Sequence, residues 1–405
     1  MWIGVFATAF AAEYNVRDIG TLGGRSAAAA AINERGQVVG IAGTAGTEQH
    51  AFLWENGEMR DLGTLGGRHS FAWDINEAGQ VVGGAQDARG KTRAVKWEGG
   101  KARDLGTLEG GEASFALAIN GRGQVVGFSQ AGDGTTHAVL WEAAGQIVDL
   151  GTLGGGFAYA VDINERGEVL GMSTTPSGHR AFLWREGEKF EVGPKDAAWS
   201  SGLDLNDAGQ VVGSAPVGSA DALLGYRWSP DGTVETFGLG GDIVIVAAVN
   251  ASGHAAGYGT LANGSGSAIE ASAGAELPGM PTELVSAEDA PPVAVHAFVY
   301  RDGAVIDLGT LGGAHASAVD INVKGHVVGA SARADGVPRA YVWADGAMGE
   351  LDTPPDASAG ATDINDRGEV VGSWAVEGRR RAFLAVPCQP GAPCGSRPSR
   401  PPSTE

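Results

Sequence analysis

Aspartate recurs at one position relative to a turn-forming asparagine. It stands two residues before the asparagine of the phrase Asn-x-x-Gly at Asp74, Asp162, Asp204, Asp320 and Asp363, and alanine takes that place at Ala31, Ala118 and Ala248. Carboxylate oxygens are preferred calcium ligands, so a ring of these aspartates would hold a cation. The alternative, which we favour, is that each aspartate accepts backbone N–H groups beside its own hairpin. The sequence therefore requires no cofactor, and calcium is the one alternative.

Aromatic side chains gather five and seven residues before the same asparagine, in four neighbouring repeats. With one histidine, the set is His69, Phe71, Phe115, Phe157, Tyr159 and Trp199. Rings at a concave mouth suit the faces of sugars or the apolar side chains of a partner. The alternative is that residues two apart share one face of a strand and pack between repeats. These six residues are the candidates for ligand binding.

Carboxylates also interrupt the Leu-Gly-Gly segments between repeats, at Glu109, Glu112, Asp196 and Asp242. A pair of carboxylates could do acid–base work on a glycosidic bond, although nothing in the sequence fixes their separation. The chain contains no nucleophile elbow, phosphate-binding loop, dinucleotide fingerprint or His-Glu-x-x-His element. We therefore assign no catalytic residue and leave enzymatic activity open, with the balance against it.

A repeat of about 43 residues must position these side chains. The phrase Asn-x-x-Gly-x-x-x-Gly occurs at Asn33, Asn76, Asn120, Asn164, Asn206, Asn250, Asn322 and Asn365, with spacings of 43, 44, 44, 42, 44, 72 and 43. A period near 40–45 residues is typical of propeller blades. Within residues 57–100 we expect four short strands, at 57–65, 70–76, 79–83 and 93–97. The sequence thus predicts an all-β propeller.

Two further columns of residues have structural interpretations. An aromatic column is expected to pack repeat against repeat: Trp54, Trp97, Trp141, Trp184, Trp228, Tyr300 and Trp343. A second column alternates histidine with arginine: His50, Arg93, His137, Arg180, His296, Arg339 and Arg381. Because the two residue types exchange freely, we expect a solvated edge or a cation over a neighbouring ring, not a metal or catalytic site.

The two ends of the repeat region predict how the ring closes. Residues 14–24 read as the last strand of a blade without its first three, and residues 363–386 as the first three without the last. Pairing the two fragments would leave no free edge. We predict eight four-stranded blades, or seven if the weak copy around Asn250 is expelled.

Composition limits the partners. The net charge of −20 and the pI of about 4.8 disfavour nucleic acid and anionic lipid. Residues 1–12 resemble the hydrophobic and cleavage regions of a secretory signal and predict export, the alternative being a frayed chain start. No segment is long and apolar enough to span a membrane as a helix.

The propeller is expected to occupy residues 13–386 as a monomer. Residues 259–293, rich in Ala, Gly, Ser, Glu and Pro, are expected to be a flexible insertion in one blade. Residues 387–405 are expected to be a Pro-rich disordered tail. Its two cysteines, Cys388 and Cys394, could close a small loop in an oxidising compartment.

The repeated phrases resemble the HAF repeat of a bacterial extracellular family. They are LGTLGG, Ile-Asn-x-x-Gly-Gln-Val-Val-Gly and His-Ala-Phe-Leu-Trp, with the His-Ala-Phe triplet at 50–52 and 296–298, His-Ala-Val at 137–139, and Arg-Ala-Phe at 180–182 and 381–383. The resemblance covers residues 14–386 and implies a secreted or surface repeat protein of propeller architecture. It brings no established activity and no catalytic residues.

We therefore expect an exported, non-catalytic scaffold or binding module. Its expected target is a carbohydrate or a protein at the cell surface. One alternative is a propeller hydrolase or lyase that acts on polysaccharides. The other is a structural protein stabilised by a cation in the aspartate column.

Overall fold

The computed structural model of the chain describes residues 13–218, 222–262, 294–388 and 394. The expected signal segment at 1–12, most of the expected insertion at 259–293 and most of the expected tail at 387–405 lie outside the described residues. Within them the chain forms 32 strands and no helix, so the all-β prediction is confirmed.

The strands fall into consecutive four-stranded units, of which the first four follow the chain order directly. They are β2 (Gly23–Ile32), β3 (Val38–Thr44), β4 (Gln49–Glu55) and β5 (Glu58–Asp61) in unit 1; β6 (Gly66–Ile75), β7 (Val81–Asp87), β8 (Thr92–Glu98) and β9 (Lys101–Asp104) in unit 2; β10 (Ser114–Ile119), β11 (Val125–Gln130), β12 (Thr136–Trp141) and β13 (Ile147–Gly151) in unit 3; and β14 (Ala158–Ile163), β15 (Val169–Thr175), β16 (Gly178–Arg185) and β17 (Glu188–Val192) in unit 4.

The other four units continue the pattern and end on the two termini of the repeat region. They are β18 (Ser201–Leu205), β19 (Val211–Pro216), β20 (Leu223–Trp228) and β21 (Val234–Phe237) in unit 5; β22 (Gly240–Val249), β23 (Ala255–Leu261), β24 (Val295–Arg301) and β25 (Ala304–Gly309) in unit 6; β26 (Gly312–Ile321), β27 (Val327–Arg333), β28 (Pro338–Ala344) and β29 (Ala347–Glu350) in unit 7; and β30 (Ser358–Ile364), β31 (Val370–Val376), β32 (Arg379–Pro387) and β1 (Tyr14–Asp18) in unit 8.

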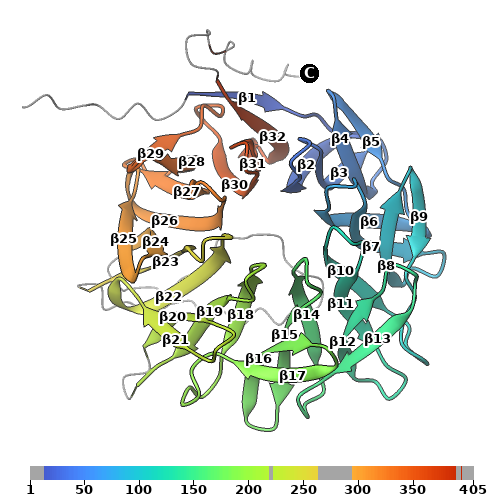
Figure 1. The fold of residues 1–405 in the computed structure, drawn as a ribbon. Coiled ribbons are helices and arrows are strands. Elements are labelled where there is room, and N and C mark those ends of the chain that lie inside the picture. The colour runs from blue at the N-terminus through green and yellow to red at the C-terminus, as the bar shows by residue number, and fades with distance from the viewer. Residues whose placement is uncertain (1–12, 219–221, 263–293, 389–393, 395–405) are drawn as a thin grey trace, which may run out of the picture.

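Each unit is an antiparallel meander, and the units lie around a common centre (Figure 1). Five units are separate sheets, whereas units 5 to 7 join into one twelve-stranded sheet. Single parallel pairs make these joins, Leu223 with Ile243 and Val295 with His315. The N-terminal β1 pairs antiparallel with β32, from Tyr14 opposite Pro387 to Asp18 opposite Phe383.

The meander gives the ring two distinct faces. The turns between first and second strands and between third and fourth strands lie on one side, which we call the turn face. The connections between second and third strands, and the links from one unit to the next, lie on the opposite side, which we call the connector face. These positions follow because successive strands of a meander reverse direction.

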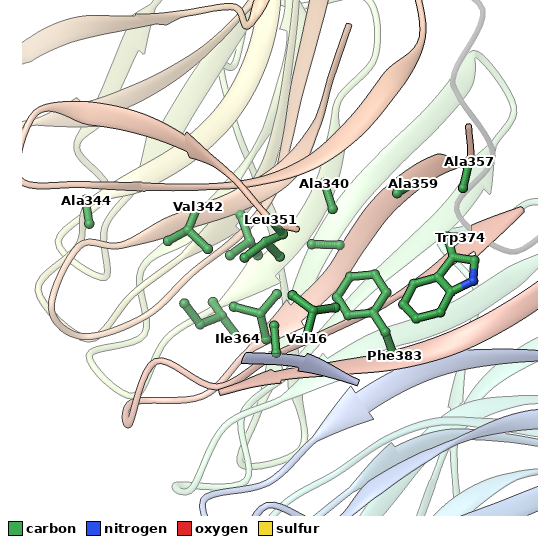
Figure 2. Close-up of a cluster of buried hydrophobic side chains, with 14 residues drawn as sticks. Val16, Ala340, Val342, Ala344, Leu351, Ala357, Ala359, Ile364, Trp374 and Phe383 are labelled. Carbon is green, nitrogen blue, oxygen red and sulfur yellow. The ribbon is translucent and has the colours of Figure 1, made fainter. Parts of the chain in front are cut away.

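The hydrophobic core lies between neighbouring units. One buried cluster joins Val39 and Ala51 of unit 1 to Val81 and Trp97 of unit 2. Another surrounds Val16 of β1, which Figure 2 shows beside Phe383 and near Trp374. In the aromatic column, Trp54, Trp97, Trp141, Tyr300 and Trp343 are all buried, which confirms the predicted packing role.

The Asn-x-x-Gly phrase forms a tight turn. In unit 1 the Gly36 N–H donates to the Asn33 carbonyl oxygen at 3.0 Å, and Gly36 has a φ of 73°. Glycine adopts this left-handed conformation without steric cost. The turn leads directly from β2 into β3.

Candidate functional site

The turn asparagines also link each unit to the next. Each side-chain Nδ2 donates to the main-chain carbonyl oxygen of the asparagine in the following unit, at 2.9–3.2 Å. The series starts at Asn33, and Asn365 donates back to the carbonyl oxygen of Asn33. The eight asparagines thus form a closed cycle of hydrogen bonds. We had expected the turn but not this cycle.

A β-bulge in each first strand positions the aspartate column. In unit 2 the register shifts between Ala72 and Asp74, so Trp73 is an extra residue. Asp74 Oδ1 accepts the N–H of Ile75 at 2.7 Å, and Oδ2 accepts the N–H of Ile119 in the next unit at 2.9 Å. The other four aspartates repeat this arrangement, so each carboxylate bridges two units.

The five aspartates together accept one equivalent backbone N–H group from each of the eight units. Eight equivalent N–H groups each donate to at least one of them: those of Ile32, Ile75, Ile119, Ile163, Leu205, Val249, Ile321 and Ile364. Leu205 and Ile364 donate to two aspartates each. The alanines at 31, 118 and 248 are tolerated because no two of them lie in adjacent units.

The aspartate side chains are not fully buried, but the protein atoms around their carboxylates displace most of the surrounding water. Burial raises the pKa of Asp74 and Asp204, and it raises the pKa of Asp162 and Asp363 well above the ordinary value. Repulsion from Asp204 adds to the rise at Asp162, and repulsion from Asp320 adds to it at Asp363. Asp162 with Asp204, and Asp320 with Asp363, are therefore close pairs of carboxyl groups, and this proximity raises the pKa of Asp162 and of Asp363.

The geometry of the column matches the favoured structural interpretation. Each of its carboxylates accepts backbone N–H groups. Among the described residues no group of three or more His, Cys, Asp or Glu side chains is placed to hold a metal ion. Calcium binding at Asp74, Asp162, Asp204, Asp320 and Asp363 stays a prediction.

The histidine and arginine column has a role that we had not predicted. Its members pair with a carboxylate at the end of the fourth strand of their own unit: His50 with Asp61, Arg93 with Asp104, His137 with Asp149, Arg180 with Glu191, His296 with Asp307, Arg339 with Glu350, and Arg381 with Asp18. Asp61 Oδ1 also accepts the N–H of Gly63 at 2.7 Å. The pairs therefore join the start of the third strand to the end of the fourth strand and stabilise the connector face. The signal in the sequence is an acidic residue 11 or 12 positions after the cation in six of the seven pairs.

The predicted ligand-binding rings form separate contacts, not one cluster. Phe115 is buried between Trp73 and Phe128, and any side chain at Gly84 would collide with its ring. Phe157 and Tyr159 contact each other, with ring centroids 5.7 Å apart. Tyr159 also packs against the core between units 4 and 5.

The remaining candidates are only partly buried. Phe71 pairs across the sheet with Gly84. His69 Nδ1 accepts the N–H of Gln49 at 3.2 Å. Trp199 lies against His179, with ring centroids 4.8 Å apart. Burial and the neighbouring Arg180 lower the pKa of His179, which favours its neutral ring. A ligand role for these residues stays a prediction.

A pocket of about 340 Å³ opens on the connector face of unit 4. It is lined by Arg180, Glu191, Val192, Gly193, Pro194 and Lys195. Arg180 Nε lies 3.7 Å from Glu191 Oε2. The Nη1 of Arg180 is buried and has no hydrogen-bond partner among the described residues. A buried donor without an acceptor is costly.

In unit 7 the equivalent arginine, Arg339, has backbone acceptors for the N–H groups of its guanidinium. Its guanidinium is 1% exposed and donates to the carbonyl oxygens of Thr353, Pro354 and Ala357 at 2.6–2.8 Å. The two segments from the fourth strand to the next turn asparagine have the same spacing, 14 positions from Leu351 to Asn365 and from Val192 to Asn206. The described chain of unit 4 nevertheless provides no acceptor for Arg180 Nη1. The pocket is thus a local departure from the repeat.

The carboxylates proposed for acid–base work lie elsewhere and are exposed. Glu109, Glu112 and Asp196 lie in connector segments, Asp242 lies near the start of β22, and all four are exposed. Glu112 lies 2.9 Å from Lys91, and the hydrogen bond and charge of that lysine lower the pKa of Glu112. A general acid for glycoside cleavage needs a raised pKa, so this residue is poorly suited to that role.

Two further findings bear on the setting of the protein. None of the described residues forms a helix long and apolar enough to cross a membrane. Cys388 and Cys394 form a disulfide bond.

Comparison with known proteins yields structural similarity only. No family profile matches the sequence, and the search of curated proteins finds no significant relative. The β-propeller domain of the Trilobed protease from Pyrococcus furiosus has 15% identity and a TM-score of 0.46, over 78% of this chain and 94% of that one. Virginiamycin B lyase from Staphylococcus aureus has 9% identity and a TM-score of 0.45, over 92% and 100%.

A third neighbour is an acylaminoacyl peptidase from Pyrococcus horikoshii. It has 13% identity and a TM-score of 0.45, over 87% of this chain and 58% of that one. The four-stranded antiparallel units around a common centre define an all-β repeat fold (Figure 1).

Proposed function

We propose that this protein is an exported, non-catalytic β-propeller of eight blades, and that its connector face binds a carbohydrate or a protein at the cell surface. The observation that carries the binding role is the pocket beside Arg180, whose buried Nη1 has no partner among the described residues. The repeated polar groups are engaged with one another in the asparagine cycle, the aspartate bridges and the cation–carboxylate pairs. In the cation column, Arg180 Nη1 and Arg381 Nε are buried donors without a partner among the described residues, and Arg180 is the one of these two that lines the pocket.

The number of blades is supported by the asparagine cycle. The weak copy around Asn250 takes its place in the cycle, because Asn206 donates to the Asn250 carbonyl oxygen and Asn250 donates to that of Asn322. Expelling this unit would break two hydrogen bonds of the cycle. Eight blades therefore account for the structure better than seven.

Export is supported by two observations. The Cys388–Cys394 disulfide would be stable in an oxidising compartment. The repeats resemble those of a bacterial extracellular family, and a secretory signal is the interpretation that we favour for residues 1–12.

A thermal-shift panel tests the binding role. The full chain is heated with soluble polysaccharides of neutral and acidic composition, with calcium, and with a chelator. A ligand that binds only the folded state raises the unfolding midpoint, and ligand at 100 times its Kd adds about 2.7 kcal/mol. We expect a rise with one class of saccharide. A rise with calcium alone would instead favour a cation-stabilised structural protein, and no rise with any saccharide would contradict carbohydrate binding.

A further inference from the structure

We propose that the pocket beside Arg180 binds a saccharide unit that carries a single carboxylate, such as a uronic acid, with Arg180 as the residue that binds the carboxylate. This inference rests on the proposed binding function and names the chemical class of its ligand. It depends on three properties of the pocket: an unpaired cationic donor, a net positive charge and a neighbouring acceptor.

The unpaired donor specifies an acceptor group on the ligand. Arg180 Nη1 is buried without a partner, whereas Nη1 of the equivalent Arg339 donates to the carbonyl oxygens of Pro354 and Ala357. The loop of unit 4 does not supply these acceptors, so an acceptor group brought by a ligand would take their place. A guanidinium prefers a carboxylate, because charge assistance makes such hydrogen bonds roughly twice as strong as neutral ones.

The charges in the pocket specify an anion of low charge. Arg180 and Lys195 are positive and Glu191 is negative, so the lining side chains carry one net positive charge. The chain as a whole carries −20. A polymer with a charge on every unit would meet this acidic surface beyond the pocket and be repelled. A ligand with one carboxylate avoids that repulsion.

Glu191 makes a hydroxyl-rich acid a better ligand than an acidic peptide. Its carboxylate is 64% exposed beside the cations and offers acceptors to hydrogen-bond donors. The hydroxyl groups of a uronic acid can donate to Glu191 while its carboxylate accepts from Arg180. An aspartate or glutamate side chain would bring a second carboxylate toward Glu191 and no donor.

The volume of the pocket agrees with the size of a single sugar ring. About 340 Å³ lies at the lower end of the range for small-molecule pockets. The walls formed by Val192 and Pro194 are apolar and suit the carbon face of a sugar. The pocket is therefore matched to one terminal sugar unit and not to an extended segment of polymer.

The experiment measures the affinity of the full chain for D-glucuronate and D-galacturonate by ligand-observed NMR. D-glucose is the neutral probe and N-acetylglutamate the peptide-like probe. The variants are Arg180→Gln and Lys195→Ala, and the matched control is Arg93→Gln, which removes the same type of cation in unit 2. Lys195 is exposed, so its variant tests the proposal even if Arg180→Gln does not fold.

We expect a uronate to bind, with roughly tenfold weaker binding in Arg180→Gln, weaker binding in Lys195→Ala and no change in Arg93→Gln. Equal affinity for glucose and glucuronate, or full affinity in both pocket variants, would overturn this inference. So would binding of N-acetylglutamate without binding of either uronate.

The controls separate this inference from the broader proposal. If a neutral saccharide raises the unfolding midpoint but no uronate binds the pocket, the carbohydrate-binding function stands and this inference fails. If no saccharide of any class binds, this inference and carbohydrate binding both fail, and a protein is then the partner that the broader proposal retains.

Discussion

At the scale of single residues, the aspartates differ in how many backbone N–H groups depend on each of them alone. Asp74 is the only aspartate bonded to the N–H groups of Ile75 and Ile119, since Ala31 and Ala118 occupy the adjacent units. Asp162 shares the N–H of Leu205 with Asp204. The five carboxylates are therefore not equivalent, although they occupy the same position of the repeat.

This difference predicts unequal stability losses. Asp74→Ala leaves two buried N–H groups without their carboxylate, and Asp162→Ala leaves only that of Ile163. At about 1–3 kcal/mol for each unsatisfied group, Asp74→Ala should lower the free energy of unfolding about twice as much. Urea denaturation of both variants measures this. Equal losses, or a larger loss in Asp162→Ala, would argue against the bridging role.

The aspartate pairs also predict a pH dependence. The folded-state pKa of Asp162 is raised, so the folded protein holds its proton more tightly than the unfolded chain does. Its contribution to stability is then present at low pH and is lost as the pH rises through the folded pKa. We expect the free energy of unfolding to increase as the pH falls through the raised pKa of Asp162 toward the ordinary aspartate pKa, by at most about 1.4 kcal/mol per pH unit for one proton. The same titration of Asp162→Asn should show a smaller slope, and an unchanged slope would contradict the assignment.

At the scale of elements, the sequence predicted what is local and missed what joins distant residues. The Asn-x-x-Gly turn and the buried aromatic column follow from residue type and short spacing. The hydrogen bond from one asparagine to the next spans 42 to 72 residues and exists only once the units are placed side by side. The missing acceptor at Arg180 Nη1 could not be predicted either, because the spacing from Val192 to Asn206 equals that from Leu351 to Asn365, where the chain supplies acceptors to Arg339.

The asparagine cycle makes the turns into links between units. Asn250→Asp keeps the Oδ1 acceptor that receives the Ser252 and His254 N–H groups, but it removes the donor to the Asn322 carbonyl oxygen. We expect a loss of about 1–3 kcal/mol in the free energy of unfolding, because the carbonyl and the new carboxylate repel. Chemical denaturation measures it. A loss near zero would show that the cycle contributes little.

The strand β1 is expected to be needed for a closed edge. A chain lacking residues 1–18 would remove Val16 from the buried cluster with Phe383 and expose the edge of β32 (Figure 2). We expect a lower unfolding midpoint and self-association, since a free strand edge is open to pairing. A chain lacking only residues 1–12 retains β1 and is the control. Monomeric behaviour of both chains with the same midpoint would contradict this role.

At the scale of the whole molecule, the repeats build a rigid ring whose two faces differ. The turn face carries the asparagine cycle, which repeats in every unit. The connector face carries the segments in which the units differ, including the pocket of Arg180, Pro194 and Lys195. The repeated hydrogen bonds therefore stabilise the ring, and the connector segments that differ between units provide the candidate binding surface.

The most direct test of this account is amide hydrogen exchange of the full chain, with and without the saccharide that raises its unfolding midpoint most. The account predicts slower exchange in residues 178–200, around the pocket, and unchanged exchange in the Asn-x-x-Gly turns on the opposite face. Protection of those turns, or no protection at residues 178–200, would contradict ligand binding at the connector face.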